Sequence, residues 1–413
     1  MRPFWTFASA GQLTFGPDSI KEIGRIAVDL VSHRSLNVAH LPIQALIVTD
    51  QNLVNAGVVD RVTQPLIESG IKCDIFDEGA AEPSIEIAQK CARHVDVQSC
   101  PPDVVIGVGG GSNMDVAKIV AALIRHGGSP EHWFGFGKVP GPVTPLICVP
   151  TTAGTGSEVS HSAVLTDTTN RIKVSALSPF LRPARAIVDP KLTVSCPSKA
   201  TAESGIDAIT HAIEAFTAVD HNKLDVPPDE ATPYTGRTPM GDLLAQQAIA
   251  LVGQHLRTAV NKPTNLEARE GMALAATLAG MAFSNCGVAV VHALEYPIGA
   301  AVHCSHGAGN GLLLPYVMRY NLPERSAEFR RIAHLLGEDT SGASDEEAGE
   351  VCIASIEKLK RDIGIPERLR DIGVTQGQLP ELAGKSFEIT RLMKLNPRTP
   401  TEEDLAKILK DAY

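Results

Sequence analysis

The stretch that decides the fold is VVIGVGGGSNMDVAK, residues 104–118. A run of β-branched residues leads into three consecutive glycines, Gly109–Gly111, and a helical pattern begins directly after Ser112. Glycine lets the backbone approach a bulky anion, and the free N–H groups at a helix start favour phosphate oxygens. The stretch therefore predicts a pyrophosphate-binding turn, with a tight turn that binds nothing as the alternative. Its spacing differs from the G-x-G-x-x-G of a standard dinucleotide fold.

The segments around this stretch alternate between short β-branched runs and helical patterns, which is typical of parallel βαβ units. The predicted strands cover residues 45–49, 72–76, 103–108 and 146–149, and the predicted helices cover 50–70, 84–97 and 113–125. From about residue 190 long Ala/Leu/Ile-rich helical patterns replace the strand signals. We therefore expect an α/β dinucleotide-binding domain over 1–190 and an all-helical metal-binding domain over 191–413.

Composition excludes several classes of function. The formal net charge of −10, without any Lys/Arg-rich run, argues against a nucleic acid partner. The N-terminal stretch MRPFWTFASAGQLTFG contains no apolar run long enough for a signal sequence or a membrane span. We therefore expect a cytoplasmic protein with no membrane partner. The eight cysteines lack C-x-x-C spacing, which favours free thiols in a reducing compartment.

Two more polar segments follow predicted strands, where the carboxyl ends of a parallel sheet meet ligands. Asp50 ends the strand ALIVT, and a carboxylate there can bind ribose hydroxyls and repel a 2′-phosphate, or simply cap the next helix. The hydroxyl-rich loop PTTAGTGSE, residues 150–158, can hydrogen-bond a diphosphate, a ribose or a carboxamide, or can cap a helix. Both segments are compatible with a nucleotide and with a purely structural role.

The strongest site signal lies in the helical half. Asp207 and His211 are four residues apart in GIDAITHAIEAF, so a helix places them on one face, a spacing that suits a divalent metal. His292 and His306 follow, and one carboxylate with three imidazoles is a set suited to Fe²⁺ or Zn²⁺. A lone histidine at any of these positions is more often a core or surface residue, and sequence alone does not bring the four together.

Three neighbouring features have weaker signals. Glu214 lies near the face of Asp207 and His211, and is expected either to support a ligand or to be exposed. His303 is a candidate for proton movement or a bystander. Val219–Pro239, rich in Pro, Asp and Thr, interrupts the helical patterns and is predicted to be a surface loop.

Taken in order, these segments resemble the iron-dependent (group III) alcohol dehydrogenase family. The matching stretches are GGGSNMDVAK, PTTAGTGSEVS, GIDAITHAIEA, the Gly287–Gly299 segment, HGAGNGLLLPYVMRYN and NPRTPTEEDLAKILKDAY. The resemblance runs from about Gly11 to the C-terminus. It implies a Rossmann-like α/β domain followed by an all-α domain, with a cleft between them.

The resemblance also implies roles for individual positions. The positions that match the family's metal ligands are Asp207, His211, His292 and His306. Those that match its NAD contacts are Asp50, Gly110, Gly111, Ser112, Thr151, Thr152, Thr155, Lys173 and Leu192. Asp50 matches the residue that favours NAD over NADP. The family metal is iron, and the ligand set also accepts zinc.

The implied activity is a metal-dependent, NAD(H)-linked hydride transfer between a small alcohol and its aldehyde or ketone, in a homodimer or higher homo-oligomer. Where many members carry a second histidine after the third ligand, this chain has Tyr296, so Tyr296 and His303 become the candidate catalytic residues. Tyr296 and the long 219–239 loop look like the hydroxyacid–oxoacid transhydrogenase branch. Activity on a 2- or 4-hydroxy acid is therefore one alternative, and a non-oxidoreductase lyase on the same scaffold is another.

Overall fold

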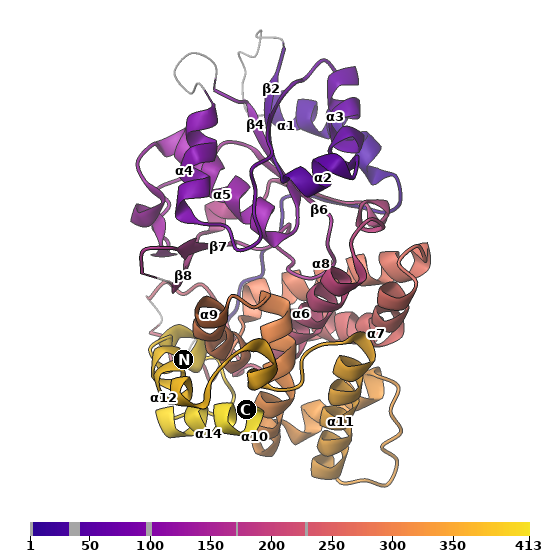
Figure 1. Cartoon of the computed structure of the whole chain (residues 1–413), viewed down its shortest axis with the longest axis vertical. Coiled ribbons are helices and arrows are strands. Elements are labelled where there is room, and N and C mark those ends of the chain that lie inside the picture. The colour runs from indigo at the N-terminus through magenta and orange to yellow at the C-terminus, as the bar shows by residue number, and fades with distance from the viewer. Residues whose placement is uncertain (1–2, 33–41, 96–100, 171, 228–229) are drawn as a thin grey trace. The chain divides into compact units, whose positions relative to one another are not determined.

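The computed structural model describes residues 3–32, 42–95, 101–170, 172–227 and 230–413, which form two compact units (Figure 1). The first, the sheet unit, comprises Ser9–Thr152 and Gly156–Ser195. The second, the helical unit, comprises Cys196–Tyr413 together with Met1–Ala8 and the short segment Ala153–Thr155. The N-terminal segment and three residues of the hydroxyl-rich loop, residues 150–158, therefore belong with the helices.

The sheet unit contains a six-stranded sheet whose pairings among the described residues are all parallel. Its strands are β1 (Leu13–Phe15), β2 (Gln44–Val48), β3 (Lys72–Phe76), β4 (Val104–Gly109), β6 (Leu146–Pro150) and β9 (Arg185–Val188), in the order β1-β9-β6-β4-β2-β3. The chain moves outward from β2 to β3 and then returns to place β4 on the other side of β2. The carboxyl ends of β2 and β4 thus flank the point where the strand order reverses, where open α/β sheets bind ligands.

The four predicted strands are present, within one or two residues of their expected bounds. β1 and β9 at one edge were not predicted, so the glycine turn follows the fourth strand of the chain and not the third. A small second sheet, in the order β5-β8-β7, was also missed; its strands are β5 (Gly135–Phe136), β7 (Ser162–Asp167) and β8 (Ile172–Leu177).

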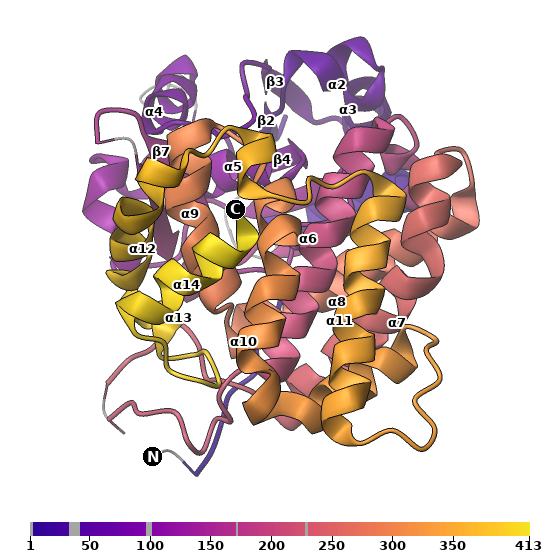
Figure 2. The same ribbon diagram turned by 60° about the horizontal axis from the view of Figure 1, so that its bottom comes forward.

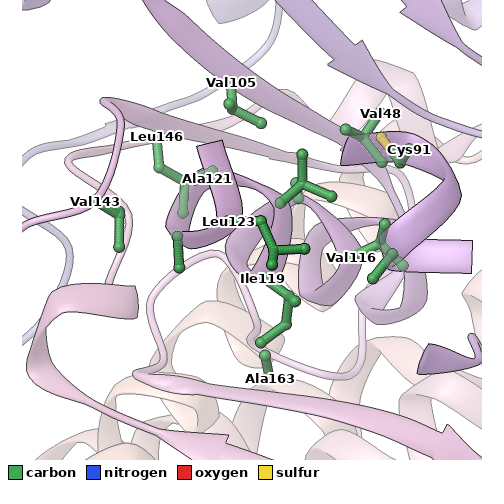
Figure 3. Packing of buried hydrophobic residues seen from close by; sticks show 14 of the residues in the cluster. Val48, Cys91, Val105, Val116, Ile119, Ala121, Leu123, Val143, Leu146 and Ala163 are labelled. Atoms are coloured by element: carbon green, nitrogen blue, oxygen red, sulfur yellow. The ribbon is translucent and has the colours of Figure 1, made fainter. Parts of the chain in front are cut away.

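Helices α1 (Ile23–Ser32), α2 (Gln51–Asn55), α3 (Val58–Glu68), α4 (Ile85–His94) and α5 (Gly111–His126) belong to the sheet unit. The single helix predicted over 50–70 is two helices, because Gly57 adopts a left-handed conformation with φ 69°. Helix α5 is the most deeply buried of this group. Its Val116 and Ile119 pack in one apolar cluster with Val105 of β4, Leu146 of β6 and Ala163 of β7 (Figure 3).

The helical unit has no strand among its described residues. Its helices are α6 (Ser198–Thr217), α7 (Pro239–Asn261), α8 (Leu266–Cys286), α9 (Val290–Val302), α10 (His306–Leu335), α11 (Asp345–Ile363), α12 (Leu379–Phe387), α13 (Thr390–Met393) and α14 (Glu402–Ala412). Helix α6 packs against α7, α8 and α10 (Figure 2). Because neighbours surround it, α6 buries polar side chains as well as apolar ones.

No single helix in the described part of the chain is long and apolar enough to cross a membrane. The pair α8 and α9 meets that criterion only when taken together, and the two helices are bent by 103° relative to each other.

The Val219–Pro239 segment is more than the surface loop that its composition predicted. Three of its described apolar side chains are buried, Leu224, Val226 and Tyr234, and so is the polar Thr238. Arg237 lies over the Phe216 ring at 4.8 Å and donates to Asp242 at 2.9 Å. The segment is therefore anchored by apolar burial and by an ion pair to the first turn of α7.

Candidate metal centre and dinucleotide-binding turn

Four side chains from three helices of the helical unit converge on one point. Asp207 and His211 lie one turn apart on α6, His292 lies in the first turn of α9, and His306 begins α10. One ligand atom from each lies within 4.8 Å of all the others. The Oδ1 atom of Asp207 is 3.8, 3.9 and 4.0 Å from the Nε2 atoms of His211, His292 and His306. The structure thus brings together the four residues that the sequence could not connect.

This arrangement fits a divalent metal. Four ligands at bonds of about 2.1 Å and tetrahedral angles lie about 3.4 Å from one another, somewhat less than the 3.8–4.0 Å that separates Asp207 from the three rings. Asp207 is only 2% exposed, so its carboxylate has lost its water and needs a positive partner. Three imidazole nitrogens with one carboxylate oxygen form a donor set that iron(II) and zinc both accept.

Two further carboxylates hold the histidine rings from behind. Glu214 of α6 lies with Oε2 2.5 Å from Nδ1 of His292, and its Oε1 accepts the backbone N–H of Val291. Glu295 of α9 lies with Oε2 2.5 Å from Nδ1 of His306. An Nδ1–H that donates to a carboxylate leaves the Nε2 lone pair free to face the centre. Glu214 is buried and plays the supporting role that was one of its two expectations.

Sequence reasoning missed Glu295 and Asn310. Glu295 is fully buried, three residues after His292 on α9. Asn310 is fully buried four residues after His306 on α10, and its Nδ2 donates to Oδ1 of Asp207 at 2.8 Å. The only local signal for either residue is its spacing from a ligand, which places it on the same helical face.

The protonation states suit metal binding. Burial lowers the pKa of His211 to about 3, so its ring is neutral at neutral pH and keeps a lone pair. Burial on its own would raise the pKa of Asp207, but the facing rings of His211, His306 and His292 outweigh it and hold that pKa below its usual value. The His211 ring also stacks on Phe283, with centroids 4.2 Å apart, which fixes its plane. The centre therefore presents an ionised carboxylate at Asp207 and a neutral imidazole at His211.

The two candidate catalytic residues differ in position. Tyr296 is half-buried beside the centre, and its ring centroid lies 6.0 Å from that of His306 and 6.4 Å from that of His292. His303 is exposed at the end of α9, where it adopts a left-handed conformation with φ 53°. Tyr296 therefore borders the ligand rings directly, and His303 is at the solvent side of the same helix end.

The glycine turn of the sheet unit has the predicted form. Strand β4 ends at Gly109, Gly110 caps α5, and the helix begins at Gly111. The N–H of Thr151 donates to the carbonyl of Gly109 at 2.9 Å, and a Cβ atom at Gly110 would lie 3.5 Å from Oγ1 of Thr152. The first N–H groups of α5 and the Thr152 hydroxyl therefore lie at the same turn, and such donors at a helix start suit a phosphate.

Asp50 performs the structural role that was its alternative, and it also sits beside the glycine turn. Its Oδ1 caps α2 by accepting the N–H groups of Asn52 and Leu53 at 2.9 and 3.2 Å. Its Oδ2 accepts from Nδ2 of Asn113, in the first turn of α5, at 2.7 Å. The carboxylate at the end of β2 is thus tied to the helix that starts at the end of β4.

The remaining predicted NAD contacts lie in varied surroundings. Thr155 belongs to the helical unit, where the adjacent Gly154 packs against Ser204 of α6. Lys173 lies on β8 and forms an ion pair with Glu82 at 3.2 Å. Leu192 is 1% exposed, and its side chain packs in the core, so a nucleotide could meet only its backbone. The roles of these three residues stay predictions.

Comparison with known proteins places these features in a family. The model for iron-containing alcohol dehydrogenase matches residues 10–190, and the model for the C-terminal part of the Fe-containing alcohol dehydrogenase family matches residues 230–413. The chain is 36% identical to a 1,3-propanediol dehydrogenase of Klebsiella pneumoniae, over 97% of this chain and 96% of that protein. It is 35% identical to an NAD-dependent methanol dehydrogenase of Bacillus methanolicus, over 94% and 97%.

The fold also matches that of solved structures. A crystal structure of 1,3-propanediol oxidoreductase superposes with a TM-score of 0.90 at 35% identity, covering 99% of this chain and all of that one. The similarity therefore spans both the glycine turn and the four-residue centre.

Proposed function

The chain belongs to the iron-containing alcohol dehydrogenase family, and we propose that its own substrate is a small primary alcohol or the corresponding aldehyde. It is an NAD-linked oxidoreductase that interconverts an alcohol and a carbonyl compound by hydride transfer. Methanol and 1,3-propanediol, which name two relatives, are both primary alcohols. Neither the transhydrogenase alternative nor the lyase alternative gains support from the comparisons over this activity.

We assign metal binding to Asp207, His211, His292 and His306, on the strength of their convergence. Asp207 supplies the negative charge, and the three histidine rings supply nitrogen lone pairs. Glu214 and Glu295 keep the His292 and His306 rings in the tautomer that points Nε2 inward. Iron(II), or zinc in its place, supplies Lewis acidity toward the substrate hydroxyl when bound.

Dinucleotide binding falls to the turn at the carboxyl ends of β2 and β4. The N–H groups of Gly110, Gly111 and Ser112 are positioned to bind a pyrophosphate, with Thr151 and Thr152 alongside. Asp50 is positioned to accept the ribose hydroxyls and to repel a 2′-phosphate, which favours NAD over NADP. NAD itself supplies the hydride chemistry, and the protein supplies orientation and charge.

Proton movement is assigned to Tyr296, whose ring borders His292 and His306, with the exposed His303 exchanging protons with solvent. Tyr296→Phe removes only the hydroxyl and keeps the ring packing. We expect it to lower turnover and to change the pH profile of turnover, and to leave metal content unaltered. A pH profile and turnover identical to those of the wild type would reduce Tyr296 to packing.

The single observation that carries this function is the convergence of one carboxylate and three imidazoles from α6, α9 and α10. Its test is metal analysis of anaerobically purified protein, followed by NADH absorbance over a panel of primary alcohols, secondary alcohols and 2- and 4-hydroxy acids. We expect about one metal ion per chain and the fastest NADH formation with a primary alcohol. Faster turnover of a hydroxy acid would replace our substrate with that of the alternative branch.

We also propose a cytoplasmic enzyme that forms a homodimer or a higher homo-oligomer. The described cysteines are all free thiols, as suits a reducing compartment. Sedimentation of the purified protein tests the assembly, and a monomer at micromolar concentration would contradict it.

A further inference from the structure

Asn310 has a polar side chain at the metal centre, but it is not one of the four assigned ligands. It is fully buried on α10, and its Nδ2 lies 2.8 Å from Oδ1 of Asp207. The same nitrogen lies 3.1 Å from Nε2 of His292 and 3.1 Å from Nε2 of His306. Its carboxamide therefore contacts three of the four assigned ligand atoms.

The other end of this carboxamide has no hydrogen-bond partner in the described part of the chain. Oδ1 of Asn310 is buried and accepts no hydrogen bond there, and leaving a buried polar atom unsatisfied is unfavourable. No described group on the side away from the metal centre hydrogen-bonds the carboxamide, so the contacts with the ligand atoms alone decide whether Nδ2 or Oδ1 faces the centre. Carboxamide oxygen and nitrogen are nearly equal in size, and the terminal torsion of asparagine is broad and two-fold, so either orientation fits the same space.

A cation at this centre reverses the preference. The Nε2 atoms of His292 and His306 each have one lone pair directed inward, because Glu214 and Glu295 occupy their Nδ1 sides. A bound cation takes those lone pairs, so the Nδ2 hydrogens of Asn310 lose two acceptors and face a positive charge. An amide oxygen in the same place is a good ligand for a hard divalent cation.

We propose that Asn310 is a fifth metal-facing residue of the centre, which presents its carboxamide oxygen to the bound cation. This inference rests on the proposed function, because it requires a metal held by the four assigned ligands. It adds an oxygen donor from α10, one turn after His306, and makes the same helix contribute two groups to the metal. The set then has three nitrogen and two oxygen donors, which shifts the site toward iron(II) and away from four-coordinate zinc.

Two substitutions separate the oxygen from the rest of the side chain. Asn310→Asp keeps the size and provides an oxygen in either orientation, so it should retain metal at least as firmly as the wild type. Asn310→Leu keeps the branching at Cγ and removes both polar atoms, so metal should leave about 10–100-fold faster, the usual effect of losing a group that supports a metal site. The probe is Co²⁺ alone, loaded into the intact protein and removed by a chelating dye whose absorbance gives the rate.

Asn321 provides the matched control. It is another buried asparagine on α10, 4% exposed, whose Nδ2 donates to Oδ1 of Asn396 at 3.0 Å, away from the centre. Asn321→Leu should lower stability without changing the rate of Co²⁺ loss. A difference between Asn310→Leu and Asn321→Leu therefore reports the metal centre and not general damage to α10.

The visible absorption of the Co²⁺ protein gives a second reading that is independent of activity. If the Asn310 oxygen faces the metal, Asn310→Leu should intensify the Co²⁺ band as the coordination number falls, and Asn310→Asp should keep the wild-type spectrum. Equal Co²⁺ loss and equal spectra for the wild type and Asn310→Leu would overturn this inference and leave the four-ligand centre intact. Equal damage from Asn310→Asp and Asn310→Leu would also overturn it. Failure of the wild type to hold Co²⁺ would overturn the proposed metal centre itself.

Discussion

Each of the two units buries a network of charged side chains, and the two networks differ in whether every hydrogen-bond acceptor is paired with a donor. In the sheet unit the fully buried ammonium of Lys118 donates to Oγ of Ser157 at 2.7 Å, the carbonyl of Ser162 at 2.7 Å and Oγ of Ser160 at 3.1 Å. Asp115, 3.5 Å from Lys118, accepts from Ser157 and from the N–H of Val164. Donors and acceptors are paired, so the network ties α5 to the segment that leads into β7.

In the helical unit the acceptors outnumber the donors at the centre. Asp207 and the Nε2 atoms of three histidines point inward, and the buried Nδ2 of Asn310 is the donor placed among them. Carboxylates behind two of the rings hold them so that these Nε2 atoms face the same point. A network whose charges are already matched stabilises a fold, whereas converging lone pairs on buried groups indicate a place for a cation.

The largest expected effect comes from removing a ligand. His211→Ala should lower alcohol turnover by about a thousandfold or more, because Lewis acidity contributes several kcal/mol and each 1.4 kcal/mol is about tenfold. Metal content should fall with it, and NAD binding, measured by nucleotide titration, should persist because Gly110–Ser112 and Asp50 lie in the other unit. Full turnover with full metal content would remove His211 from the centre.

Removing the ammonium from the matched network should act on stability alone. Lys118→Met leaves Asp115 as an uncompensated buried charge, which costs about 3–5 kcal/mol of unfolding free energy. Urea unfolding of the metal-loaded protein measures this loss, and metal analysis should find unchanged content. If the variant lost its metal while keeping its stability, the contrast between the two networks would be wrong.

Neutralising a carboxylate behind a ligand should have an intermediate effect. Glu295→Gln keeps the shape but weakens the hold on Nδ1 of His306, so metal affinity should fall about tenfold. Glu214→Gln should give a similar loss through His292. Competition with a chelating dye measures both affinities, and wild-type affinity in both variants would show that the rings need no such support.

The smallest expected effect concerns cofactor choice. Asp50→Gly removes the repulsion between the Asp50 carboxylate and the 2′-phosphate of NADP. Two like charges about 4 Å apart in water repel by about 1 kcal/mol, so the preference should shift from NAD toward NADP by about fivefold. Glycine is a tolerable helix cap, so α2 should lose only a few tenths of a kcal/mol. Steady-state kinetics with both nucleotides gives the ratio, and an unchanged ratio would leave Asp50 as a helix cap only.

The same contrast explains what the sequence could predict. The alternating β-branched and helical runs predict the parallel sheet and the glycine turn because their signals are local. β1 and β9 were not predicted because LTF and RAIV are too short to show the alternation of apolar and polar residues that marks a strand. The metal ligands Asp207 and His211 are recognisable because one helical turn joins them.

Glu295 and Asn310 could not have been found from local pattern. Their roles arise only when the helices pack together: Asn310 of α10 then meets Asp207 of α6, 103 positions away in the chain, and Glu295 of α9 meets His306 at the start of α10. The buried side chains of the Val219–Pro239 segment were hidden for the same reason, because a Pro- and Asp-rich composition says nothing about what the segment covers.

The most direct test of the central claim is a titration of chelator-treated wild-type protein with Fe²⁺ under anaerobic conditions, followed by NADH formation from NAD and a primary alcohol. We expect no turnover after chelation and a linear rise that saturates at about one Fe²⁺ per chain. NADH formation that survives complete removal of metal would contradict it.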